Sequence, residues 1–158
     1  MGRLFDGFYA LITHTKAQDY HGQAPVLLES MAATTTESYP LCFYEENNIR
    51  FFDWSEMIHY AVTETKAPEI QAAKMMNTII EMTIDQTLHL NPKHLPIVLS
   101  GGCFQNQYLL KEIVHRLQEL QYRVYWHTQV SCNDEGIALG QLAIAQKMDV
   151  ILCVLRFL

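Results

Sequence analysis

The sequence predicts an α/β fold, and three observations lead to this prediction. Residues 97–100 and 122–126 are short apolar stretches typical of strands. Each is followed by a polar loop and then by a segment whose apolar residues recur at helical spacing, which gives a βαβα unit. The glycine pair at 101 and 102 ends the first strand. Because open α/β sheets bind ligands at the carboxyl ends of their strands, we expect both loops to face one crevice.

Two helices are predicted before this unit begins. Residues 2–13 place a set of apolar side chains on one helical face: Leu4, Phe5, Phe8, Leu11 and Ile12. Residues 19–25 read as a loop, and a short helix follows with Pro25 near its first turn, where proline is tolerated.

A hairpin and a further helix are predicted next. Residues 41–46 and 49–53 flank Asn47 and Asn48, a pair that tolerates the left-handed conformation of a two-residue turn. An Asp-x-x-Glu capping pattern at 53–56 then begins another helix.

The longest helix is predicted from Pro68 to about Leu90, and we expect it to pack across the sheet. The helix after Asn106 carries core residues through Leu120. The last helix runs from about Gly136 to Lys147, and the apolar residues 150–155 form either one more strand or a tail of unknown role.

Composition excludes several classes of protein. A chain of 158 residues with 49% apolar residues fits one globular core. A net charge of −6 argues against a nucleic-acid surface, because binding phosphate backbones needs a basic stripe. The four cysteines form no CxxC pair, which favours a reduced, cytoplasmic setting. No secretion signal is expected, and the longest apolar run is too short to span a membrane.

The two polar loops carry the chemistry that suggests a site. Adjacent glycines bring a charged ligand close to bare N–H groups, and the N-terminus of the following helix adds partial positive charge. Asn106 supplies an amide that both donates and accepts. Asp134, about to enter a helix, either binds a metal or acts as a cap. By themselves these features suit a phosphate or a ribose but do not name a reaction.

Three strings resemble a known family. Residues 99–106 read Leu-Ser-Gly-Gly-Cys-Phe-Gln-Asn, residues 133–141 read Asn-Asp-Glu-Gly-Ile-Ala-Leu-Gly-Gln, and residues 2–6 read Gly-Arg-Leu-Phe-Asp. Together they resemble the C-terminal part of the HypF family, the carbamoyltransferases of nickel–iron hydrogenase maturation. More distantly they resemble the TsaD family, which transfers threonylcarbamoyl to tRNA. The resemblance covers residues 1–148 and leaves 149–158 as an apolar tail.

The resemblance implies a fold and a reaction. The fold is a partial lobe of an actin-like ATPase, related to ribonuclease H, with the hairpin as an addition. The parent protein uses ATP and carbamoyl phosphate to make carbamoyl-adenylate and transfers the carbamoyl group to the C-terminal cysteine of HypE, which leads to a cyanide ligand. We expect this chain to be a C-terminal fragment that lacks the N-terminal domains of its parent and is inactive alone. It is expected to bind neither nucleic acid nor membrane.

The resemblance also assigns site residues. Gly101 and Gly102 would cradle the adenylate phosphate or the adenine edge, and Asn106 would bond to the nucleotide. Asp6 and Gly22 would bind the sugar.

Asp134 would be one ligand of a divalent iron or zinc ion. The family holds this metal with a further His-x-x-x-His pair, and the seven histidines of this sequence include no two that are four apart. The other ligands are therefore expected upstream. His21, Cys103 and Glu135 depart from the residues expected at their positions. No catalytic residue can be assigned.

Two other interpretations stay open. The first is a non-catalytic module that binds a nucleotide or docks onto another protein. The second is a fragment of an antibiotic O-carbamoyltransferase, which shares the two-loop layout.

Overall fold

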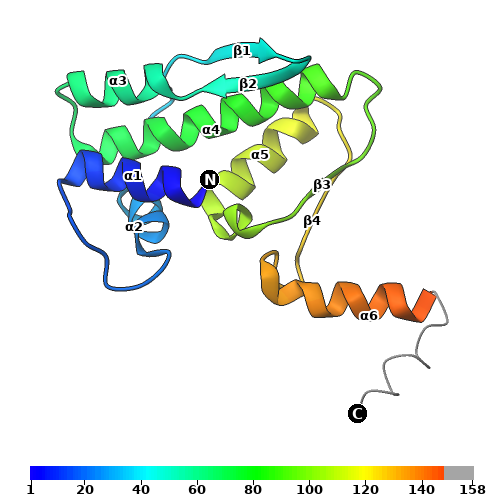
Figure 1. The fold of residues 1–158 in the computed structure, drawn as a ribbon. Coiled ribbons are helices and arrows are strands. Elements are labelled where there is room, and N and C mark those ends of the chain that lie inside the picture. The colour runs from blue at the N-terminus through cyan, green and yellow to red at the C-terminus, as the bar shows by residue number, and fades with distance from the viewer. Residues whose placement is uncertain (148–158) are drawn as a thin grey trace.

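Helix α4 (Pro68–Leu90) is the longest helix of the computed structural model, which describes residues 1–147, and it runs through the middle of the helical body (Figure 1). Pro68 occupies its first turn, as predicted. Helices α1 (Gly2–Thr13), α2 (Gln23–Met31) and α5 (Gln107–Glu119) pack against it. The expectation that this helix crosses the sheet was therefore wrong. The strands are too short to offer a broad face, and α4 buries its apolar side chains against other helices instead.

The core lies between these helices and is mostly aliphatic and aromatic. Most of its fully buried members come from α1, α2, α3 (Ser55–Thr63), α4 and α5, and they include Phe8, Leu28, Met57, Met76 and Leu117. Phe8 also meets Tyr39 edge to face, with ring centroids 6.1 Å apart. The predicted apolar face of the first helix is thus confirmed as a core face.

The predicted hairpin is confirmed as an antiparallel pair, β1 (Cys42–Glu46) and β2 (Ile49–Asp53). Asn47 and Asn48 have φ angles of 53° and 61°, the left-handed values that a two-residue turn requires. Arg50 fixes the hairpin along α4 (Figure 1), because its guanidinium lies 2.7 Å from Asp85 and 3.3 Å from the amide oxygen of Gln86.

The predicted βαβα unit is present with small strands. Strands β3 (Ile97–Leu99) and β4 (Val124–Trp126) pair in parallel, with Leu99 opposite Trp126. A 3-10 turn (Gly102–Gln105) precedes α5, and a second one (Asp134–Gly136) precedes α6 (Ile137–Lys147). This arrangement confirms the α/β class. Residues 149–158, the predicted apolar tail, lie outside the described residues.

Two local predictions were wrong. The capping pattern at residues 53–56 does not form, because the helix begins at Ser55 and Asp53 instead accepts a hydrogen bond from the Ser55 amide at 2.9 Å. Leu120, predicted to be buried, is 38% exposed. Helix α5 ends at Glu119, and Gln121 turns the chain away with a φ of 64°.

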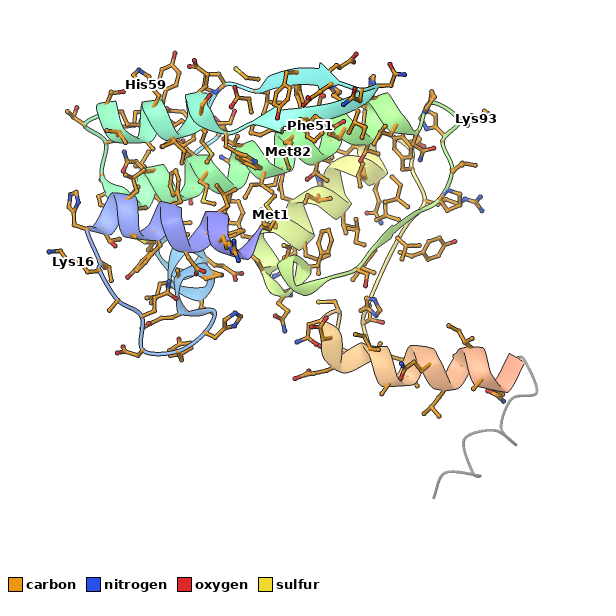
Figure 2. The ribbon with its side chains drawn as sticks, viewed as in Figure 1. Met1, Lys16, Phe51, His59, Met82 and Lys93 are labelled. Atoms are coloured by element: carbon orange, nitrogen blue, oxygen red, sulfur yellow. The ribbon has the colours of Figure 1, made fainter. Side chains whose placement is uncertain are left out.

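Several apolar side chains of β3 and α6 are exposed. Val98 on β3 is 70% exposed and Leu142 on α6 is 68% exposed. Figure 2 shows α6 apart from the helical body, with its visible side chains in contact with no part of that body. Among the described residues, no helix combines the length and the apolar character needed to cross a bilayer.

Candidate functional site

The loop between α1 and α2, on which Lys16 lies (Figure 2), forms one wall of a cavity of about 460 Å³ that we call the loop cavity. Asp6 from α1 lines it, together with Tyr20 and His21. Gln18 ties this loop to both helices. Its amide nitrogen donates to the Asp6 carboxylate at 3.2 Å, and its amide oxygen accepts from the backbone of α2 at 3.4 Å. No pattern in the sequence pointed to Gln18.

A second cavity, of about 520 Å³, lies beside the first, and we call it the glycine cavity. Gly22, Gly102 and Asn106 all line it, although the sequence separates the first of them from the others by some eighty residues. Tyr20 and His21 line both cavities. The structure therefore brings together three of the predicted site residues and places Asp6 next to them.

Gly22 takes a backbone conformation that favours glycine. Its φ of 85° lies in the left-handed region, immediately before α2 begins. The position lies where the loop between α1 and α2 turns into α2. The prediction that a glycine backbone lies at this site is thus compatible with its geometry, whereas a side chain here would be strained.

Two residues of the loop after β3, Gly102 and Cys103, line the glycine cavity. Gly101 has a φ of 109°, which ends the strand. Inside the following 3-10 turn, the N–H groups of Gly102 and Cys103 donate to no acceptor among residues 1–147, and both residues line the cavity. Cys103 is a free, partly buried thiol.

The N-terminus of α5 is already occupied. Glu29 from α2 accepts from the amides of Gln107 and Tyr108, at 2.7 and 3.2 Å, and the Asn106 side-chain oxygen accepts from Leu109 at 2.9 Å. The partial positive charge expected to attract a ligand is therefore neutralised by a carboxylate of the protein itself. No local pattern marks Glu29, because its partners lie 78 and 79 residues away.

Asn106 is only 7% exposed and acts as the N-cap of α5. Its amide nitrogen faces the sulfur of Met76 at 3.6 Å. Both polar ends of the side chain thus have partners within the protein, so the residue shapes the cavity wall as well as being a candidate for contact with a ligand.

The second loop is joined to the first by a hydrogen bond, but none of its residues lines either cavity, so these cavities do not bear out the prediction that both loops face one crevice. The Gly101 amide donates to the Cys132 carbonyl oxygen at 2.7 Å. Asn133 caps the short turn before α6, since its side-chain oxygen accepts from the Glu135 amide at 3.0 Å. Asp134 is exposed to solvent and lines neither of the two cavities described above.

A histidine and a serine meet where the two strands end. The imidazole Nε2 of His127 lies 3.0 Å from the hydroxyl oxygen of Ser100. The sequence singled out His127 as the histidine nearest the crevice but did not point to Ser100. The strand register could have done so, because the residues that follow Leu99 and Trp126 must be neighbours.

The described residues do not fit a complete metal centre. Among residues 1–147 no three His, Cys, Asp or Glu side chains cluster closely enough to hold an ion. A catalytic metal normally takes about three protein ligands. Asp134 would be a single ligand, so these residues cannot by themselves support a chemical step on a metal ion.

Close packing explains why residue 136 is a glycine. The sequence motif in which Gly136 lies gave no reason for it. A Cβ atom at this position would lie 2.6 Å from the Ser131 carbonyl oxygen. We expect Gly136→Ala to lower the free energy of unfolding by about 1–3 kcal/mol, because the loop must move to accommodate the methyl group. Thermal or urea unfolding measures this. Gly140→Ala is the matched control, since that helical glycine has open space around it and alanine should be neutral or stabilising there. Equal losses in both variants would contradict the packing role.

Known proteins share the sequence and the fold of this chain. Residues 1–141 match the family described as "Carbamoyltransferase, Kae1-like Domain, second subdomain". Carbamoyltransferase HypF from Synechocystis is 33% identical over 145 residues, which are 90% of this chain and 19% of that protein. A crystal structure of full-length HypF in the phosphate- and nucleotide-bound form superposes with a TM-score of 0.83 at 34% identity, over 94% of this chain and 20% of that one.

The chain therefore belongs to the HypF family of carbamoyltransferases, and it spans about a fifth of the length of these relatives. The family resemblance read from the sequence strings is confirmed. The likeness to HypF supports an α/β fold with small sheets, consistent with an actin-like lobe.

Proposed function

We propose that this chain is the C-terminal, nucleotide-facing part of a carbamoyltransferase. The parent protein would move a carbamoyl group from carbamoyl-adenylate, made from ATP and carbamoyl phosphate, to the C-terminal cysteine of a HypE-type protein in the cytoplasm. What supports the proposal is the glycine cavity, where Gly22, Gly102 and Asn106 meet beside Asp6. The fold would be one lobe of an actin-like ATPase.

In this reaction no residue of this lobe would form a covalent bond with the substrate. The acceptor thiolate attacks the carbamoyl carbonyl carbon, a C–S bond forms, and the C–O bond to the adenylate phosphate breaks, so that AMP leaves. This chain would bind and orient the adenylate. The amides of Gly102 and Cys103 would donate to it, and Asp6 and Gly22 would bind its sugar. The iron or zinc ion of the parent would take its remaining ligands from outside this chain, with Asp134 as one.

The exposed apolar side chains near β3 and on α6 would be covered by the preceding part of the parent protein. Four of them are each at least 60% exposed: Leu95 just before β3, Val98 on β3, and Leu142 and Ile144 on α6. Apolar surface of this extent is characteristic of an interaction site. Both long edges of the β3–β4 pair also lack a further strand among the described residues. We therefore expect that the isolated chain transfers no carbamoyl group.

Nucleotide binding tests the first part of the proposal. AMP should bind the chain, and Gly102→Val should raise its Kd by at least about tenfold, because the new side chain enters the cavity that Gly102 lines. Gly7→Ala, at an exposed glycine of α1 with open space, is the control and should leave the Kd unchanged. Calorimetric titration measures all three. Absence of AMP binding, or equal binding by Gly102→Val, would favour a non-catalytic docking module.

Carbamoyl transfer tests the second part. With labelled carbamoyl phosphate, ATP and a HypE-type acceptor, the full-length parent should label the acceptor cysteine and this chain alone should not. Turnover by this chain alone would refute the expectation that the lobe is incomplete.

A further inference from the structure

Tyr20 lies where the loop cavity meets the glycine cavity, because it is one of two residues that line both, the other being His21. Of these two cavities, Asp6 lines only the first and Gly22 only the second. Tyr20 is 56% exposed, and among residues 1–147 no pair of aromatic rings includes it. A ligand whose sugar lay between Asp6 and Gly22 would therefore have an unpaired tyrosine ring beside it.

The loop that carries Tyr20 is held by hydrogen bonds on both sides of this residue. The Asp19 amide donates to the Gln23 side-chain oxygen at 2.7 Å, and the Gln23 side-chain nitrogen donates to the Asp19 carboxylate at 3.3 Å. The Tyr20 carbonyl oxygen accepts from the Gln23 backbone amide at 3.3 Å. Gln18 ties the same loop to α1 and α2. The backbone of Tyr20 is thus fixed while its side chain stays exposed, so binding would have little of the loop left to order.

The glycine cavity suits a neutral, flat group better than a phosphate. None of the described residues that line it is Lys or Arg, and Glu29 adds a negative charge to its wall. The amides of residues 107–109 already donate to Glu29 and Asn106. Four of the residues that line the cavity are instead apolar: Met1, Phe5, Pro25 and Val26. A purine base would bury apolar area against such a wall, whereas a phosphate would lose its hydration there.

We propose that the glycine cavity takes the base of the bound adenylate and that the Tyr20 ring stacks on this base. Stacking needs only the π face of each ring, and it requires no cation and no further hydrogen bond from the cavity wall. With the base in the glycine cavity, the sugar stays beside Gly22 and Asp6. The inference rests on the proposed function, because it requires a nucleotide in this cavity.

The first test is the affinity for AMP, measured by calorimetric titration of the chain and its variants. Tyr20→Ala should raise the Kd about tenfold, because it removes the ring that contacts the base. Tyr20→Phe keeps the ring and loses only the hydroxyl, so it should retain the wild-type Kd. Tyr60→Ala is the matched control, since Tyr60 on α3 is 43% exposed and lines neither cavity.

The second test reports contact with the base directly. In Tyr20→Trp, AMP should quench the fluorescence of the new indole, whereas ribose 5-phosphate, which lacks the base, should not. The wild-type chain is the control, because its own Trp54 and Trp126 line neither cavity and should show no quenching.

The outcomes separate this inference from the proposed function. A weaker AMP affinity in Tyr20→Ala but not in Tyr20→Phe or Tyr60→Ala, with quenching by AMP alone, supports stacking. An unchanged Kd in Tyr20→Ala overturns stacking and leaves nucleotide binding intact. Equal losses in Tyr20→Ala and Tyr20→Phe, or equal quenching by ribose 5-phosphate, also overturn it. Failure of the wild-type chain to bind AMP overturns the nucleotide role itself, and the stacking with it.

Discussion

Replacing Lys74 with methionine is expected to lower the free energy of unfolding by about 3–5 kcal/mol. The Lys74 side chain is 8% exposed, and its ammonium lies 2.6 Å from one carboxylate oxygen of Glu64. The other oxygen accepts a hydrogen bond from the Tyr39 hydroxyl at 2.5 Å. Without the ammonium, a largely buried carboxylate loses its cation and cannot recover full hydration. Equilibrium unfolding in urea measures the loss.

Two variants distinguish this explanation from a general effect of losing a lysine. Lys66→Met removes a lysine that pairs with Glu37 at the surface, and should cost less than about 1 kcal/mol. Adding Glu64→Leu to Lys74→Met removes the stranded carboxylate and should restore much of the stability. Similar losses for the two lysines would contradict the role assigned to the buried pair.

The same pair gives a dependence on pH. Burial raises the pKa of Glu64, but the hydrogen bonds from Lys74 and Tyr39 outweigh it and hold the pKa below its ordinary value of 4.5. The unfolded chain therefore binds this proton at higher pH than the folded chain does. The stability contributed by Glu64 is full above that ordinary value and is lost as the pH falls through the lowered pKa. In Lys74→Met the acid-side decline of the unfolding free energy should be shallower, which unfolding curves between about pH 3 and 6 would measure.

Phe8→Ala is expected to have a comparably large effect, about 3–5 kcal/mol. Phe8 is 1% exposed and fixes α1 to the core through its edge-to-face contact with Tyr39. Alanine leaves a cavity that the surrounding helices can close only in part. Because Asp6 stands two residues earlier on the same helix, the loop cavity should be disturbed in whatever fraction remains folded. Urea unfolding measures the first effect and titration with AMP the second.

The control for Phe8 is a truncation at an exposed position. Val62→Ala on α3 should change stability by less than about 0.5 kcal/mol, since Val62 is 61% exposed. Phe8→Leu should lose less than Phe8→Ala because it keeps most of the buried volume. A loss in Phe8→Ala no larger than that in Val62→Ala would mean that α1 is not anchored where the structure places it.

Local sequence signals were enough to predict most elements of this fold. The turn at Asn47–Asn48, the start of α4 at Pro68 and the apolar face of α1 each depend on residues that are neighbours in the chain. The packing of α4 could not be predicted in this way. It depends on how little area the three-residue strands offer, and strand length is set by tertiary contacts rather than by propensity.

The candidate site was predicted in part. The glycines and Asn106 were found because their pattern is local. The parallel strand ends predicted that both loops face one crevice. The Gly101–Cys132 hydrogen bond does join the loops, but no residue of the second loop lines either described cavity. Two contacts were missed: the hydrogen bond from the α5 N-terminus to the Glu29 carboxylate, and the contact between Ser100 and His127. Both join residues far apart in sequence, and neither has a composition that would draw attention to it.

The hydrogen bonds from Gln107 and Tyr108 to Glu29 have a consequence for the order of assembly. They join the helix that begins at one wall of the glycine cavity to the helix that begins at the other, across nearly eighty residues of chain. Closing a loop of that length is entropically costly and comes late in folding. During synthesis, the cavity can therefore close only after residue 108 has left the ribosome, and a nascent chain that is stalled before this point should not retain a nucleotide.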